Sequence, residues 1–404
     1  MAVRQARRAP AGLAATPFLR PMKIALVWNG PVALDRISFR HENYQEGWRS
    51  LGHDAVLVTA AALAGSYTGK THLVARREEL EQVETWRDLA ADVAVGVTWH
   101  RMPAMLAAIR AAGTRVVAIA DSDGQVGFAA HPRISWLRIG AYQKSRSGQL
   151  RALRYFCRRY AASARRRDPE ELEFVASTRA SDRVVLGSAP AIDCFARFLH
   201  QQRAGELAAR LREVPFAVPE SFCTRALAPK QDRVVAIGRW SDPQKDAALL
   251  AAALRLFFAR RHGTEVVVFG ADAESALGAL ARGEPRLRLA GIQEPHIVAE
   301  TLAASRTALF SSRWETGPHA ATEALALGAT LVSPPMPNLA GMIDGGRFGA
   351  LAGSRRPDDL AAALGDELAA WDGGRRDAAA IAAHWRARLS PTAVARRLLA
   401  TLDD

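Results

Sequence analysis

The sequence predicts an α/β protein of two domains, each built on a parallel sheet. From Ile24 onward, short apolar runs alternate with amphipathic helical stretches, which is the pattern of βαβ units. The chain has 404 residues, and a domain typically takes about 100 to 200 residues. A proline-rich segment at 214–222 interrupts the alternation near the middle of the chain. Two domains of this kind would face each other across a cleft.

The composition is that of a folded protein, with 49% hydrophobic and 24% charged residues. The net charge of +13, mostly arginine, suits anionic partners such as phosphates, acidic lipid or nucleic acid, although an arginine-rich coding bias would give the same excess. Three widely spaced cysteines indicate reduced thiols in a cytoplasm rather than a disulfide framework or a metal site. No apolar run is long enough for a membrane span, and no secretory signal is expected.

Residues 1–21 hold four arginines and three prolines without periodicity, so we expect a disordered basic leader. Domains are predicted at 22–215 and 233–385, joined by a linker at 216–232 and followed by a C-terminal helix at 386–404, with a helix break at Ser390-Pro391. The strands are expected at 24–28, 55–58, 93–97, 115–120 and 183–186 in the first domain, and at 234–237, 265–269, 287–289, 307–310 and 330–333 in the second.

The most informative segment is 307–328. A buried strand is expected to end at Ser311, a loop carries Glu315, and Gly317-Pro318 opens a helix, because proline suits the first helical position. A helix N-terminus at the carboxyl end of a strand binds anions, so a diphosphate fits there. Two carboxylates, Glu315 and Glu323, would repel the phosphates unless they pointed away from them. Hydroxyl groups of the sugar and the ribose are the natural hydrogen-bond partners of carboxylates. The segment therefore predicts a nucleotide-sugar site.

A second segment, 234–246, ends a strand at Gly238 and continues with Arg239 and Lys245. The glycine lets the backbone approach a ligand closely. Arginine binds phosphate with its fork and lysine as a point charge, so the two would neutralise a diphosphate and stabilise it as it leaves. Gly270, after the strand at 265–269, is read as a strand end, with contact to a bound ligand as the alternative.

With these segments the chain from Met22 onward resembles the retaining GT-B glycosyltransferases related to glycogen synthase and the bacterial phosphatidylinositol mannosyltransferases, in glycosyltransferase family 4, group 1. Glu315-x7-Glu323, the helix tail through Gly328, and the Gly238, Arg239 and Lys245 segment carry the resemblance. It implies the GT-B fold, two Rossmann-like domains with parallel sheets facing a central cleft, the first on the acceptor side and the second binding the donor nucleotide.

The resemblance also implies roles for individual residues. Arg239 and Lys245 would grip the donor diphosphate, Glu323 would bind the ribose, and Glu315 would lie near the hydroxyls of the transferred sugar. Gly238, Gly317, Pro318 and His319 complete the expected donor-binding set. The family retains the anomeric configuration and needs neither a metal nor another cofactor. Many members read Glu-Gly-Phe-Gly where this chain reads Glu315-Thr-Gly317-Pro318, so the choice of sugar does not carry over.

In the first half, polar residues follow the predicted strands at the cleft side. Asn29 and Gly30 are expected on the acceptor side, although a plain turn is equally compatible. His100 is a candidate base or acceptor-orienting group, with an ordinary loop histidine as the alternative. Asp121, grouped with His100 and Glu315 as catalytic, pairs with Asp123 in a rival interpretation as a divalent-cation site of the GT-A type.

An amphipathic basic helix is expected over 147–167. Its apolar stripe contains Leu150, Leu153, Phe156, Cys157 and Tyr160, and arginines flank it. Such a face would suit an anionic membrane at its inner surface and a lipid-linked acceptor. The alternative is a stripe that faces the core.

The sequence thus favours transfer of a sugar from a nucleoside-diphosphate sugar to an unknown lipid-linked or glycan acceptor. The alternative is a non-catalytic basic protein of the same fold that binds membrane or nucleic acid. Nucleic acid is not expected, because aromatics make up 7% of the chain and no nucleic-acid-binding motif occurs. A dinucleotide oxidoreductase is disfavoured, since no G-x-G-x-x-G follows the first strand.

Overall fold

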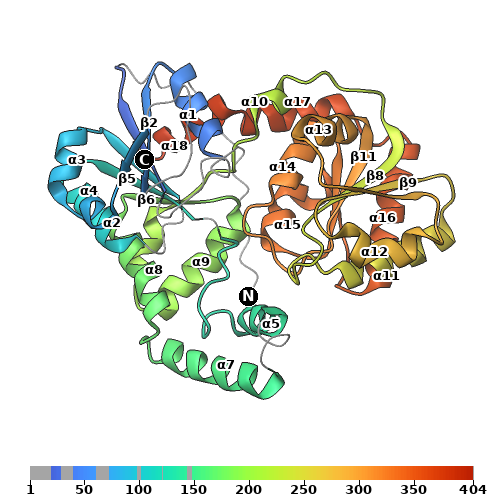
Figure 1. Ribbon diagram of the computed structural model, residues 1–404, viewed down its shortest axis with the longest axis horizontal. Coiled ribbons are helices and arrows are strands. Elements are labelled where there is room, and N and C mark those ends of the chain that lie inside the picture. Colours follow the sequence, from blue (N-terminus) through green and yellow to red (C-terminus); the bar gives the residue numbers. More distant parts are fainter. Residues whose placement is uncertain are drawn as a thin grey trace, which may run out of the picture.

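The computed structural model describes residues 20–28, 40–60, 72–97, 102–120, 122–142 and 148–403. These residues form two α/β units that lie side by side (Figure 1). Most of the predicted leader lies outside the described residues, as do Asn29, Gly30, His100 and Asp121.

Seven strands of the described chain form the first sheet, in the order β3-β2-β1-β4-β5-β6-β7, and every printed pairing is parallel. They are β1 (Lys23–Trp28), β2 (Asp54–Ala60), β3 (His72–Ala75), β4 (Val93–Val97), β5 (Arg115–Ile119), β6 (Arg183–Leu186) and β7 (Leu211–Glu213). The five predicted strands are confirmed. The two that were missed, β3 and β7, are short and form the sheet edges.

Helices cover this sheet on both faces, as βαβ crossovers require. They are α1 (Arg40–Ser50), α2 (Arg77–Leu80), α3 (Val83–Leu89), α4 (Pro103–Ala111), α5 (Pro132–Tyr142), α7 (Gln149–Ala164), α8 (Pro169–Ala180), α9 (Ala189–Gln201) and the 3₁₀ helix η3 (Gly205–Arg210). Buried apolar residues of β1, including Ile24 and Leu26, lie at the centre of the core.

The second sheet has six parallel strands in the described residues, in the order β10-β9-β8-β11-β12-β13. They are β8 (Gln231–Ile237), β9 (Glu265–Phe269), β10 (Leu287–Gly291), β11 (Ser305–Leu309), β12 (Thr330–Ser333) and β13 (Gly349–Leu351). Its helices are α10 (Glu220–Cys223), α11 (Ala247–Arg260), α12 (Ala273–Ala281), α13 (Pro295–Ala304), α14 (His319–Ala326), α15 (Pro337–Ile343), η4 (Asp344–Gly346) and α16 (Pro357–Asp372). The predicted α/β fold with two Rossmann-like units is confirmed.

The chain crosses between the units twice, and the two crossings touch. Val218 N–H donates to the carbonyl of Leu389 at 2.8 Å. Helix α17 (Ala378–Leu389) ends there, and α18 (Pro391–Ala400) starts after the predicted break, with Ser390 as its N-cap. Helix α18 returns to the first unit, where Val394 and Leu398 are buried in the same core as β1. The predicted C-terminal helix therefore consists of the end of α17 and all of α18.

Candidate functional site

A cavity of about 560 Å³ lies in the second unit, at the carboxyl ends of β8, β9 and β11. Ligands of open α/β sheets bind at this edge. The lining residues are Ile237, Gly238, Arg239, Gln244, Lys245, Gly270, Ala271, Ile292, Phe310, Glu315, Thr316, Gly317, Pro318, His319 and Ala320. The structure therefore brings together seven of the eight predicted donor-site residues of this unit, from two segments far apart in sequence.

An ion pair joins the two segments inside this cavity. Lys245 Nζ lies 2.7 Å from Glu315 Oε1, and the two side chains are only 18% and 5% exposed. Ser312 Oγ donates to the same Glu315 oxygen at 2.5 Å, and Gln244 Nε2 donates to the Trp314 carbonyl at 2.8 Å. Because each partner of the pair is largely removed from water, the loop carrying Glu315 is fixed against the β8 loop.

The backbone at Gly270 passes so close to Gly238 that only glycine fits at position 270. Gly270 has φ of +111°, and a Cβ built on it would lie 1.9 Å from the carbonyl oxygen of Gly238. A side chain there would force the ends of β8 and β9 apart. Both interpretations of Gly270 are thus compatible with its position, since it ends a strand and lines the cavity.

Arg239 lies at the mouth of the cavity, with its side chain 73% exposed and 3.1 Å from Asp242. The other oxygen of Asp242 accepts a hydrogen bond of 3.0 Å from the hydroxyl of Tyr142 in the first unit. The Tyr142 ring also meets Trp314 edge to face at 5.6 Å. Burial, reinforced by Asp242, raises the pKa of Tyr142 to about 12. The first unit therefore contacts the loops that carry Asp242 and Trp314 directly through the end of α5.

The helix after the Glu315 loop begins one residue later than predicted. Pro318 occupies the N-cap of α14 rather than its first helical position, because its ψ of 77° is not helical. No side chain caps α14. Its first residue, His319, lines the cavity and lies 5.5 Å from the ring of Phe216. The start of α14 thus lies at the cavity, which is the place that the anion-site prediction gives to it.

Glu323 differs from the other predicted donor residues, since it is not among the residues that line the cavity. It lies within α14 and is only 8% exposed. Burial raises the pKa of its carboxyl to about 7, with no neighbouring charge or hydrogen bond of the described residues opposing the shift. A hydrogen-bond donor placed beside this carboxyl would oppose the shift.

Two supporting residues were not predicted. Asn338 Nδ2 donates to the carbonyls of Glu315 and Thr316 at 2.9 Å each, and its Oδ1 accepts from Ser188 of the first unit at 3.0 Å. Arg355 bonds the Ser311 carbonyl at 2.9 Å and the Asp246 carboxylate at 2.8 Å. Asn338 could have been found from its place after the strand at 330–333, whereas nothing in the sequence pattern marks Arg355.

The rival metal interpretation of the first half gains no support. Asp123 is buried, and Arg138 Nη2 lies 2.8 Å from both of its carboxylate oxygens. Among the residues that the structure describes, no group of three His, Cys, Asp or Glu side chains is arranged to hold a metal ion. Asp123 therefore serves as the partner of an arginine on α5.

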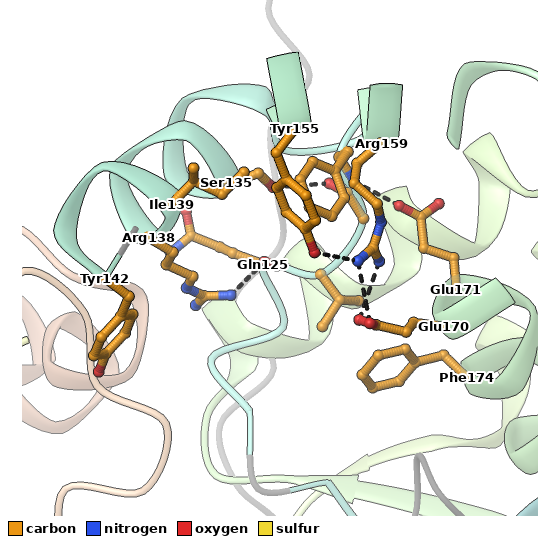
Figure 2. A pocket seen from close by; sticks show the side chains of 13 residues that line it. Gln125, Ser135, Arg138, Ile139, Tyr142, Tyr155, Arg159, Glu170, Glu171 and Phe174 are labelled. Atoms are coloured by element: carbon orange, nitrogen blue, oxygen red, sulfur yellow. Dashed lines mark hydrogen bonds and ion pairs between the residues drawn. The ribbon is translucent and has the colours of Figure 1, made fainter. Parts of the chain in front are cut away.

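A second cavity, of about 300 Å³, lies between α5, α7 and α8 (Figure 2). Arg159 of α7 binds the buried carboxylate of Asp168 and donates to the Tyr155 hydroxyl at 2.8 Å. Tyr142, which bonds Asp242 of the second unit, lines this cavity as well. The cavity thus extends from the inner face of α7 to the residue that joins the two units, and the sequence did not predict it.

Two parallel-sheet units, a cavity at the strand ends of the second, and a last helix that returns to the first define the GT-B fold. Residues 231–369 match the family of group 1 glycosyl transferases. This match covers the whole of the second sheet and the cavity residues. The match supports the interpretation of this chain as a glycosyltransferase.

Solved structures share the fold over nearly the whole chain. The apo form of the lipopolysaccharide outer core galactosyltransferase WaaB is 12% identical, with a TM-score of 0.62 and coverage of 95% of this chain and 99% of that one. Anabaena HepE in complex with UDP is 13% identical, with a TM-score of 0.64 and coverage of 95% and 100%. The catalytic domain of starch synthase IV from Arabidopsis thaliana, bound to ADP and acarbose, is 10% identical, with a TM-score of 0.60 and the same coverage. A comparison with curated protein sequences gave no match.

Proposed function

We propose that the protein transfers a sugar from a nucleoside-diphosphate sugar to an acceptor hydroxyl, with retention of configuration and without a metal ion. The observation that carries this proposal is the Lys245–Glu315 pair, 2.7 Å apart in a cavity beside the N-terminus of α14. The volume of about 560 Å³ lies within the range of small-molecule sites, about 300 to 1,000 Å³. Anabaena HepE, which shares the fold, has been solved with UDP-glucose.

The cations of the cavity suit a diphosphate. Lys245 would meet it as a point charge, and Arg239, whose exposed side chain bonds Asp242 at the mouth, would turn inward to clamp it. The N-terminus of α14 adds the backbone N–H groups of Gly317 and Ala320, because Pro318 has no N–H and the His319 N–H donates to the Gly317 carbonyl at 2.8 Å. As the bond from the sugar to the diphosphate breaks, these groups stabilise the negative charge that develops on the leaving group.

The carboxylates suit hydroxyl groups. Glu315, whose carbonyl is held by Asn338, would accept hydrogen bonds from the transferred sugar. Glu323, buried with a raised pKa, would accept them from the ribose, because no described residue donates a hydrogen bond to its carboxyl. We place Gly238 against the diphosphate, where its missing side chain leaves room.

Retention follows if the acceptor hydroxyl attacks from the side on which the diphosphate leaves. The new bond from the acceptor oxygen to the anomeric carbon forms as the bond to the diphosphate breaks, and the proton of the acceptor passes to a diphosphate oxygen. His100 and Asp121 remain candidates for assisting this step, with Asn29 and Gly30 on the acceptor side. The cysteines of the described residues are free thiols, which favours a cytoplasmic location.

A thermal-shift screen with UDP, GDP, ADP and NAD, with and without magnesium, tests the donor site. Ligand at 100 times its Kd adds about 2.7 kcal/mol, so we expect one nucleoside diphosphate to raise the melting temperature independently of magnesium. Lys245→Ala should abolish the shift, whereas Arg282→Ala, which removes an exposed charge of the same unit, should preserve it. No shift with any nucleotide would favour the non-catalytic alternative. Once the donor is known, the NMR signal of the anomeric proton in the product gives the configuration of the new bond. A configuration opposite to that of the donor would exclude retention.

A further inference from the structure

Helix α7 exposes its apolar stripe to solvent. Leu150 is 74% exposed, Leu153 47% and Tyr160 41%, and Cys157 between them is exposed as well. The alternative of a core-facing stripe is wrong for these four residues. Only Phe156 of the predicted stripe is half-buried, where it stacks on Tyr160.

A neighbouring helix extends the apolar surface. Trp136 of α5 is 37% exposed and meets Phe156 at 5.4 Å between ring centroids. Large apolar side chains gathered on one exposed face are uncommon in proteins without a partner. We call the set Trp136, Leu150, Leu153, Cys157 and Tyr160 the α7 face.

Arginines lie beside this face. At 3.6 residues per turn, Arg151, Arg154 and Arg158 fall on the flank of α7 next to the apolar stripe, and all three are exposed. Helix α7 contains no acidic residue. The exposed half of the helix is therefore divided into an apolar side and a cationic side.

The protein holds this helix in place before any partner binds. On its inner side, Arg159 binds Asp168, and its guanidinium lies 4.6 Å from the ring centroid of Phe128. Ser163 Oγ donates to Glu171 at 2.7 Å. The inner side is thus anchored by polar contacts, and the outer side needs no folding step to present its apolar residues. In Figure 1, α7 lies at the lower edge of the molecule, apart from both sheets.

We propose that the α7 face docks on an anionic lipid bilayer. The apolar side chains would enter the boundary between headgroups and acyl chains, while the arginines meet lipid phosphates, as interfacial amphipathic helices do. The charge decides between occupants: a second copy of this chain would bring its own arginines against these, whereas an anionic lipid surface neutralises them.

Docking also bears on the acceptor. The cavity of Figure 2 lies against the inner side of α7 and reaches Tyr142, which bonds Asp242 of the donor loop. An acceptor on the membrane would therefore approach the donor site along α5. This step rests on the proposed function and takes the acceptor hydroxyl to belong to a membrane lipid, whereas the docking of α7 does not depend on either.

Co-sedimentation with vesicles tests the docking without any nucleotide. We expect the full chain to bind vesicles of phosphatidylglycerol and phosphatidylcholine in equal parts and to bind phosphatidylcholine alone far more weakly. Each arginine near an anionic surface is worth about fivefold in partitioning, so replacing Arg151, Arg154 and Arg158 by glutamine should weaken binding about 100-fold. Leu150→Ser with Leu153→Ser should weaken it about tenfold or more.

The matched control removes three exposed arginines from the second unit. Arg260→Gln, Arg282→Gln and Arg356→Gln lower the net charge equally but lie away from α7, so vesicle binding should change little. Since all the altered side chains are exposed, unchanged thermal melting and an unchanged nucleotide shift should accompany every variant. Absence of binding to anionic vesicles, or equal loss in the control, would overturn the proposal. A wild-type dimer that the leucine variant converts to a monomer, with vesicle binding intact, would assign the face to self-association instead.

Discussion

Replacing Glu323 by glutamine should make the protein without ligand more stable at alkaline pH. The carboxyl is 8% exposed, and burial raises its pKa from the ordinary 4.5 to about 7. Between these two values the folded state binds the proton more tightly than the unfolded state. The free energy of unfolding therefore falls as pH rises from 4.5 to about 7, and it stays at the lower level above pH 7.

The magnitude follows from the two pKa values. One pKa unit corresponds to about 1.4 kcal/mol, so the charged carboxyl costs about 3 kcal/mol at pH 8. At pH 5 most of that cost has disappeared, leaving about 1 kcal/mol or less. Glutamine keeps the shape of the side chain and carries no charge. For a unit of this size we expect a melting temperature about 6 to 12 °C higher than wild type at pH 8, and nearly equal to it at pH 5.

Thermal melts of both proteins from pH 5 to pH 8 measure this difference directly. Glu367→Gln is the matched control, because Glu367 is also buried but lies 2.5 Å from the Arg376 guanidinium, and loss of its charge should destabilise the protein. Parallel curves for wild type and Glu323→Gln across the pH range would refute the reasoning. If the more stable Glu323→Gln variant also binds nucleotide more weakly, the buried carboxyl takes part in nucleotide binding.

Three further substitutions test the site and its supports. Lys245→Ala should lower turnover by a factor on the order of 100, measured with the sugar nucleotide whose nucleoside diphosphate the thermal-shift screen identifies. Turnover at the wild-type rate would show that Lys245 does not take part in catalysis. Asn338→Ala leaves two carbonyls of the Glu315 loop without their hydrogen-bond donor and should lower the free energy of unfolding by about 2 kcal/mol, measured by denaturation. It should also weaken nucleotide binding, measured by titration. Unchanged nucleotide affinity would limit the role of Asn338 to stability. Arg159→Met leaves the buried carboxylate of Asp168 without its arginine and should lower the free energy of unfolding by about 3 to 5 kcal/mol. Amide hydrogen exchange should become faster in α7 but not in the second unit. Exchange in α7 as slow as in the wild type would contradict the anchoring that we infer.

The sequence predicted every strand inside the two sheets and the edge strand β10, because their apolar runs are bounded by turn residues. It missed β7 and β13, which have three residues each and carry no periodicity. The missed β3 has four residues at the other edge of the first sheet. Edge strands gain less from burial, so their composition is less distinctive.

Residues of the candidate donor site were predicted where several chemically distinctive side chains lie in one short segment. Glycine, cations and carboxylates near strand ends identified Gly238, Lys245 and Glu315, and the cavity contains all three. Asn338 and Arg355 act through hydrogen bonds to backbone carbonyls of another loop, and only the folded chain brings such partners together. For α7, periodicity revealed an apolar stripe but not whether it faces the core, since burial depends on what packs against the helix.

The return of α18 to the first unit sets the order in which the chain can fold as it is made. Val394, Ala395, Leu398 and Leu399 belong to the core built around β1, although more than 350 residues separate them from it. The ribosome releases the second unit's complete sheet before it releases α18. The first unit is therefore translated first and completed last, and until the final helix emerges, the apolar surface beside α1 stays open to chaperones or to aggregation.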